Sequence, residues 1–167
     1  MRNDDTRLFV KPLLRHYTSE SHTKNTIRRF NFGQEKARDD DRLLDYVMGL
    51  DALLTNKESD LRLRFALRGA LVVSLDLAGF RGVFDDLYEA YKQRNDMAHG
   101  GDPPETITLG GGEVPIRELA DRVEAHMRTI IRAYLSRTGK KKHNLLAELD
   151  EIISRGIAGH VPNEAAS

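Results

Sequence analysis

Large apolar residues recur three or four positions apart along much of this chain, and this spacing constrains the fold more than any other feature. The first clear stripe consists of Leu43, Val47, Leu50 and Leu54. Such a stripe covers one face of an α-helix. The three aspartates at 39–41 suit the positive end of the helix dipole. The sequence therefore predicts a helix that begins near residue 39.

Further segments repeat this pattern. Residues 61–75 predict a second, strongly buried helix, with Asn56 or Ser59 as its cap, and Gly79 and Gly82 are expected to flank a break after it. A third helix covers residues 84–98 and ends at the glycines and prolines of 100–104. A fourth has Pro115 in its first turn, with its apolar stripe from residue 116 to 134. A short last helix, capped by Asn144, covers residues 145–153.

These helices and their short connections predict an all-α fold, an antiparallel bundle of four to five helices over residues 39–156. Residues 106–109 alternate like a strand but are too few to imply a sheet. Residues 1–38 are expected to form an N-terminal extension or the remnant of an upstream region, with a loop at 18–25 and a lead-in strand or turn at 28–33. Residues 157–167 are expected to form a flexible tail.

Composition narrows the function classes. The 167 residues contain no cysteine and have a formal net charge of zero. The absence of cysteine excludes disulfides and thiolate metal sites and predicts a cytoplasmic location. No membrane association is expected, because no apolar run approaches the roughly 20 residues of a membrane span. A general DNA-binding domain would be basic, so any contact with nucleic acid must be local. Since no paired-histidine helix occurs, we expect no metal and no cofactor.

One segment combines residue types that can act on a phosphodiester. Arg94, Asn95 and His99 lie at the end of the third predicted helix, and the spacing of four places Asn95 and His99 on one face. A guanidinium can grip a phosphate with two parallel hydrogen bonds, and an imidazole exchanges protons near neutral pH. An arginine followed at this kind of distance by a histidine occurs four times in the chain, so the spacing alone is weak evidence. Only Arg94 and His99 end a strong helix before a glycine turn. The alternative is a purely structural role, in which these side chains cap the helix.

The chain resembles the HEPN superfamily, whose ribonucleases carry an arginine, four to six further residues and a histidine. The resemblance is to the Apea-like branch and covers roughly residues 28–154. It is carried by residues 40–45, 50–54, 61–70 and 87–100, with Asp51 where that branch would have glutamate. It implies a metal-independent endoribonuclease with Arg94, Asn95 and His99 as catalytic residues, a symmetric homodimer, an RNA substrate and a role in antiviral or stress defence. The resemblance also implies that the domain can act together with a sensor domain or a partner protein.

Two alternatives remain beside this prediction. One is a non-catalytic HEPN module for dimerisation or for sensing a nucleotide or phosphate. The other is the toxin of a HEPN–nucleotidyltransferase pair, which Gly101 disfavours because such toxins often have tyrosine at that position. Outside the motif, Lys140, Lys141 and Lys142 form either a solvated linker or an arm that follows the RNA backbone. Tyr88 and Tyr91 suit the core or a dimer interface better than base stacking.

Overall fold

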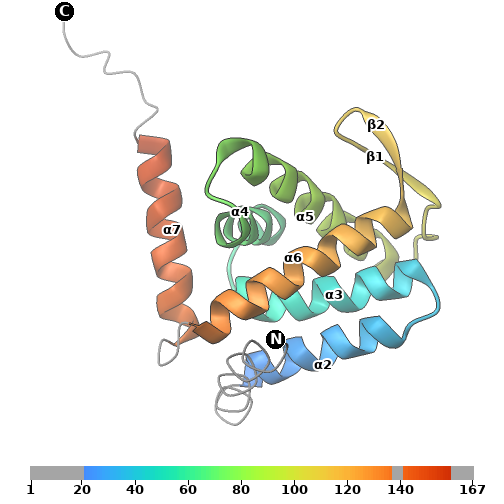
Figure 1. Cartoon of the computed structure of the whole chain (residues 1–167), viewed down its shortest axis with the longest axis horizontal. Coiled ribbons are helices and arrows are strands. Elements are labelled where there is room, and N and C mark those ends of the chain that lie inside the picture. Colours follow the sequence, from blue (N-terminus) through green and yellow to red (C-terminus); the bar gives the residue numbers. More distant parts are fainter. Residues whose placement is uncertain (1–20, 137–140, 159–167) are drawn as a thin grey trace, which may run out of the picture.

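The computed structural model describes residues 21–136 and 141–158, the last three as backbone only. These ranges hold six helices and one β-hairpin (Figure 1). The helices are α2 (Ser21–Glu35), α3 (Asp39–Leu54), α4 (Leu61–Val73), α5 (Leu77–Ala98), α6 (Ile116–Ser136) and α7 (Lys142–Ala158). The hairpin consists of β1 (Thr106–Leu109) and β2 (Gly112–Pro115). The predicted all-α bundle is confirmed.

The core forms around α3, which has α2 along one side and α4 and α5 on the other (Figure 1). Leu43, Val47, Leu50 and Leu54 of α3 are fully buried, as their spacing predicted. On α6, the equivalent stripe of Leu119, Val123, Met127 and Ile130 is also fully buried. Each such side chain contributes about 1.5–3 kcal/mol relative to leaving it exposed. These two stripes hold the bundle together and fix the position of α5 beside them.

The loop and strand predicted for residues 18–25 and 28–33 are wrong over the described residues, because α2 is one continuous helix. Its buried positions are taken by small residues, Thr23, Thr26 and Gly33. The hydroxyl of Thr26 lies 2.8 Å from the carbonyl oxygen of Gly49, so the two helices approach closely. A Cβ at position 33 would collide with the ring of Tyr46. Small contact residues leave no large apolar stripe in the sequence, which is why this helix was missed.

Several helix boundaries also differ from the predicted ones. Gly79 and Gly82 lie inside α5 rather than at a break, because the carboxylate of Asp76 caps the helix by accepting a hydrogen bond of 2.8 Å from the Gly79 amide. Neither Asn56 nor Ser59 caps α4; Asp60 occupies the cap position with φ of 55°. The last helix begins at Lys142, two residues before its predicted cap Asn144.

The segment between α5 and α6 forms a small sheet that the sequence did not predict. Ile107 pairs with Val114 and Leu109 with Gly112, leaving a two-residue turn. Gly110 and Gly111 in that turn have φ of 61° and 84°. Two successive positive φ angles match the twist of paired strands and are open mainly to glycine. The hairpin leads into α6 directly after Pro115.

Within the described ranges, no helix combines the length and apolar character needed to cross a membrane.

Candidate functional site

The carboxyl end of α5 is fixed by a glycine pair. The amide of Gly101 donates to the carbonyl of Asp96 at 2.9 Å, and the amide of Gly100 donates to that of Met97 at 3.1 Å. These two bonds form a Schellman motif, in which the residue after the cap adopts a left-handed conformation. Gly100 has φ of 86°, as this motif requires. The motif holds His99 at a defined position, as the C-cap residue directly after α5.

Replacing Gly100 by alanine is expected to lower the free energy of unfolding by about 1–2 kcal/mol, because the left-handed backbone disfavours a Cβ. No atom beyond the two adjacent residues lies within 4 Å of that Cβ, so the cost comes from the local backbone alone. The matched control is Gly82→Ala, where the added Cβ also meets nothing within 4 Å but the residue is helical. Alanine there is expected to raise stability by about 0.5–1 kcal/mol. Urea denaturation of both variants checks the opposite signs.

Arg94 and Asn95 are bonded to each other. An Nη atom of Arg94 donates to Oδ1 of Asn95 at 2.8 Å, and the guanidinium carbon lies 5.4 Å from the ring centre of Tyr91. Within the described part of the chain, no carboxylate pairs with Arg94. Burial, followed by the neighbouring carboxylate of Asp51, raises the pKa of Tyr91, so its hydroxyl stays neutral. Arg94 is therefore held in place by neutral groups and is available to pair with an anionic ligand.

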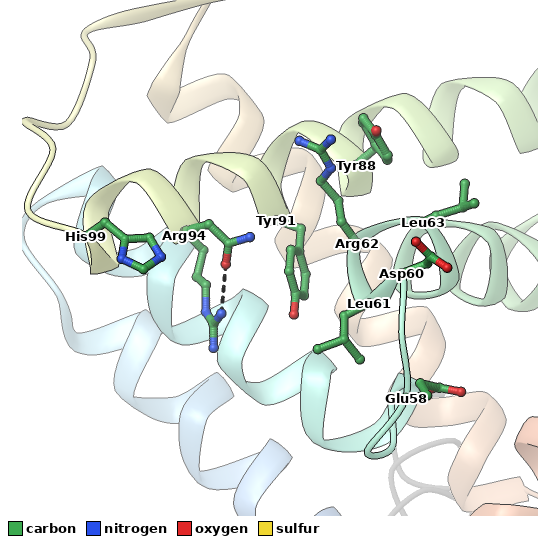
Figure 2. Close-up of a pocket in the computed structure, with 10 residues that line it drawn as sticks. Glu58, Asp60, Leu61, Arg62, Leu63, Tyr88, Tyr91, Arg94 and His99 are labelled. Carbon is green, nitrogen blue, oxygen red and sulfur yellow. Dashed lines mark hydrogen bonds between the residues drawn. The ribbon is translucent and has the colours of Figure 1, made fainter.

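His99 is exposed, and its backbone amide donates to the carbonyl of Asn95 at 3.1 Å. Its side chain, with those of Arg94 and Asn95, lines one open groove of about 650 Å³ between α4 and α5 (Figure 2). The geometry thus brings the three predicted site residues together. The helix-capping role also exists, but it is carried by the backbone of His99 and by Gly100, which leaves the imidazole exposed at the groove.

The other wall of the groove comes from the start of α4 and the loop before it, a part of the site that sequence reasoning missed. Its residues are Glu58, Asp60, Leu61, Arg62 and Leu63, and Tyr88 and Tyr91 of α5 complete the lining. The guanidinium carbon of Arg62 lies 4.2 Å from the ring centre of Tyr88. Glu58 lies four residues before Arg62, but it precedes the helix and contacts Arg68 and Arg64 instead. Four-residue spacing brings side chains together only inside a helix.

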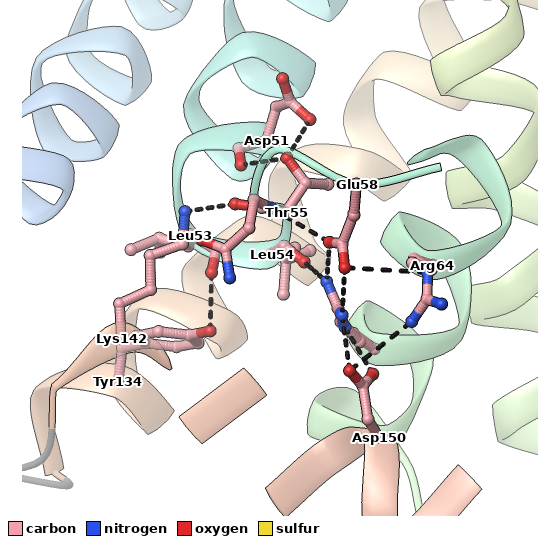
Figure 3. A network of polar contacts seen from close by, with 11 residues as sticks. Asp51, Leu53, Leu54, Thr55, Glu58, Arg64, Tyr134, Lys142 and Asp150 are labelled. Carbon is pink, nitrogen blue, oxygen red and sulfur yellow. Dashed lines mark hydrogen bonds and ion pairs between the residues drawn. The ribbon is translucent and has the colours of Figure 1, made fainter. Parts of the chain in front are cut away.

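Glu58 belongs to a cluster of charges with Arg64 and Asp150 (Figure 3), and Arg68 pairs with both carboxylates. The side chain of Arg68 is 1% exposed, and its guanidinium contacts Glu58 at 2.5 Å and Asp150 of α7 at 2.7 Å. It also donates to the carbonyl oxygen of Leu54 at 2.8 Å. Hydrogen bonding to Arg68 lowers the pKa of Glu58, so this carboxylate stays charged. The cluster ties α7 to the loop that forms one wall of the groove.

The three lysines considered for RNA binding have different environments. Lys140 lies outside the described residues, and Lys141 is exposed. Lys142 is the first residue of α7, and its ammonium donates to the carbonyl of Thr55 at the end of α3. Burial lowers the pKa of Lys142. This lysine helps to attach α7 to the bundle, so we no longer expect it to extend as an arm toward RNA.

A second histidine pairs with a carboxylate elsewhere in the fold. The Nε2 atom of His126 lies 2.9 Å from Asp86, which also accepts a hydrogen bond of 3.1 Å from Arg122. These three side chains connect α5 with α6 and do not line the groove. In the described ranges, no group of three or more histidines or carboxylates is arranged to hold a metal ion.

Comparisons of the chain with models of protein families, with curated proteins and with solved structures find no match.

Proposed function

We propose that the protein is a metal-independent endoribonuclease that acts in antiviral or stress defence in the cytoplasm. One observation carries the proposal: Arg94, Asn95 and His99 line the same open groove, and Arg94 has no carboxylate partner in the described part of the chain. An unneutralised guanidinium beside an exposed imidazole suits a phosphodiester substrate. The resemblance of the motif and of the helices around it to HEPN ribonucleases supports the same function.

The chemistry needs only groups that the protein and RNA supply. The imidazole of His99 accepts the proton of a ribose 2′-hydroxyl, whose oxygen forms a bond to the adjacent phosphorus. The bond from phosphorus to the 5′-oxygen breaks, and a second imidazole donates a proton to that oxygen. Arg94 stabilises the charge of the phosphorane, and Asn95 orients Arg94 or the phosphate. The products are a 2′,3′-cyclic phosphate and a 5′-hydroxyl.

The groove supplies one histidine, whereas this reaction benefits from two. We therefore expect a homodimer in which the ends of two α5 helices meet, so that His99 of the second copy acts as the acid. Two-fold symmetry brings equivalent residues together. Size-exclusion chromatography with light scattering is expected to give twice the 18.9 kDa mass of the chain. A monomer at every working concentration would contradict this composite site.

The proposal is tested by incubating the purified protein with total RNA, with and without EDTA. Cleavage is expected in both conditions, because the nucleophile is the substrate's own hydroxyl rather than a metal-activated water. The Arg94→Ala/His99→Ala double variant is the control and should be inactive. Activity that disappears in EDTA and returns with magnesium or manganese would refute the metal-independent mechanism.

The second candidate function is a non-catalytic module that binds a nucleotide or phosphate in the same groove. It is favoured by the single histidine that each chain contributes to the groove. Calorimetric titration with nucleoside phosphates, in parallel with the RNA assay, separates the two functions. Binding without any cleavage of RNA would support the module and contradict the nuclease.

A further inference from the structure

Three aromatic rings stack along α5 and lead toward the groove. Phe80, Phe84 and Tyr88 are spaced four residues apart, so they share one face of the helix. Their successive ring centres are 6.4 and 5.5 Å apart, and the ring planes differ by only 14° and 22°. The guanidinium of Arg62 then lies over the ring of Tyr88 at 4.2 Å. A planar cation therefore ends a column of nearly parallel rings.

Arg62 has no competing ion pair. The nearby carboxylate of Glu58 contacts Arg68 at 2.5 and 3.0 Å, and within the described ranges no carboxylate pairs with Arg62. Cation–π contact with Tyr88 therefore holds the guanidinium without neutralising it. Figure 2 shows this guanidinium on the side of Tyr88 that points along α5 toward Tyr91 and Arg94. A flat, charged group is thus presented to the groove.

Arg62 and the proposed phosphate site at Arg94 are close enough for one ligand to contact both. Arg94 follows Tyr88 by six positions in α5, which corresponds to a rise of about 9 Å along the helix axis. Arg94 is the second guanidinium of the groove that lacks a carboxylate partner in the described chain. A ligand that satisfies both arginines carries negative charge at one and a flat, polarisable group at the other. A nucleotide in a single strand has both features.

We propose that Arg62 and Tyr88 form a base-stacking subsite for single-stranded RNA, beside the nucleotide whose phosphate contacts Arg94. This subsite rests on the proposed function, because it takes the same groove as the RNA-binding site. The base stacks on the exposed face of the Arg62 guanidinium, and Tyr88 holds that group flat from behind. Stacking on a planar cation does not depend on base identity, so the subsite favours an unpaired base rather than a particular sequence.

Fluorescence anisotropy with two short DNA strands tests the subsite. One is a deoxyadenosine oligomer, and the other is an abasic strand of equal length and charge. Neither has a 2′-hydroxyl, so binding is measured without cleavage. The unmodified protein is expected to prefer the strand with bases. Arg62→Lys keeps the charge but lacks the plane, and it should reduce this preference by about 5- to 100-fold. Affinity for the abasic strand should stay nearly unchanged.

The matched control is Arg28→Lys, the same substitution at an exposed position of α2, on the opposite side of α3 from the groove (Figure 1). It should leave the preference intact, and circular dichroism should show equal helix content in both variants. Equal binding of the two strands by the unmodified protein, or an unchanged preference in Arg62→Lys, would overturn the subsite.

The result of this binding experiment is independent of whether the protein cleaves RNA. In His99→Ala the preference should persist although cleavage is lost, and a preference in a protein without cleavage would support the subsite alone.

Discussion

The His99→Ala variant is expected to cleave RNA about 10²–10⁴-fold more slowly than the unmodified protein, because it lacks the group that moves the proton. The imidazole is exposed at the groove and belongs to the C-cap residue after α5, so its removal should not affect folding. Arg94→Lys should also be poor, since an ammonium cannot copy the two-pronged contact with phosphate. Initial rates on a defined RNA, with helix content from circular dichroism, measure both effects.

The chain offers a matched control for this prediction. His143 is also exposed and also follows an arginine at a spacing that fits the general motif, but it lies at the start of α7, away from the groove. His143→Ala should keep full activity. A substrate with 2′-deoxyribose at the cut site should resist cleavage, because the attacking oxygen is missing. Full activity in His99→Ala, or efficient cutting of the deoxy substrate, would show that the proposed mechanism is wrong.

Replacing Arg68 by methionine is expected to lower the free energy of unfolding by about 3–5 kcal/mol. The side chain is 1% exposed and separates the carboxylates of Glu58 and Asp150, which are 21% and 35% exposed. Methionine fills much of the volume but removes the buried cation, and it leaves the two partly buried carboxylates with the more exposed guanidinium of Arg64 at 3.7 and 3.6 Å. The variant also gains repulsion between the two carboxylates, because the guanidinium no longer lies between them.

Arg64→Met is the control for this second prediction. Arg64 lies 3.7 and 3.6 Å from the same two carboxylates but is 39% exposed, so its loss should cost less than about 1 kcal/mol. Urea denaturation at neutral pH compares the two variants. Arg68→Lys keeps the charge and should be intermediate, which preserves the test if the methionine variant does not fold. Similar losses for Arg64→Met and Arg68→Met would contradict the importance of burial.

The same cluster predicts a dependence on pH. Arg68 lowers the pKa of Glu58, so the stabilisation is complete above the usual pKa of glutamate and is lost as the pH falls through the lowered value. The cost of Arg68→Met should therefore be largest at neutral pH and should shrink in acid.

The sequence predicted those elements whose contacts are made by large apolar residues. Helices α3 and α6 have such stripes. Helix α3 begins where the sequence placed it, and α6 begins directly after Pro115, which was predicted to lie in its first turn and instead ends β2. Helix α2 was missed because it packs through threonine and glycine. The partner strand of the hairpin was missed because four residues with two glycines before them give little pattern. In each case, the visibility of an element in the sequence depends on the size of the residues at its contacts. A periodic apolar pattern reveals a helix or strand only when these residues are large.

In the candidate site, the sequence predicts which residues of one helix lie together. It does not predict contacts between residues that are far apart in the sequence. The grouping of Arg94, Asn95 and His99 follows from helical spacing and from the two glycines that end α5. The opposite wall of the groove requires the packing of α4 on α5, which no local pattern encodes. Arg68 is the clearest case, because it occurs in an apolar stretch and its partner Asp150 is 82 residues away.

The loop between α3 and α4 contributes Glu58 both to the groove and to the contacts that hold α7. Ligand occupancy and helix docking are therefore linked thermodynamically through one carboxylate. Any ligand that stabilises the observed position of this loop strengthens the docking of α7, and by reciprocity a docked α7 strengthens binding of that ligand by the same factor. Hydrogen exchange at the amides of α7 can thus report on what occupies a groove formed by other helices.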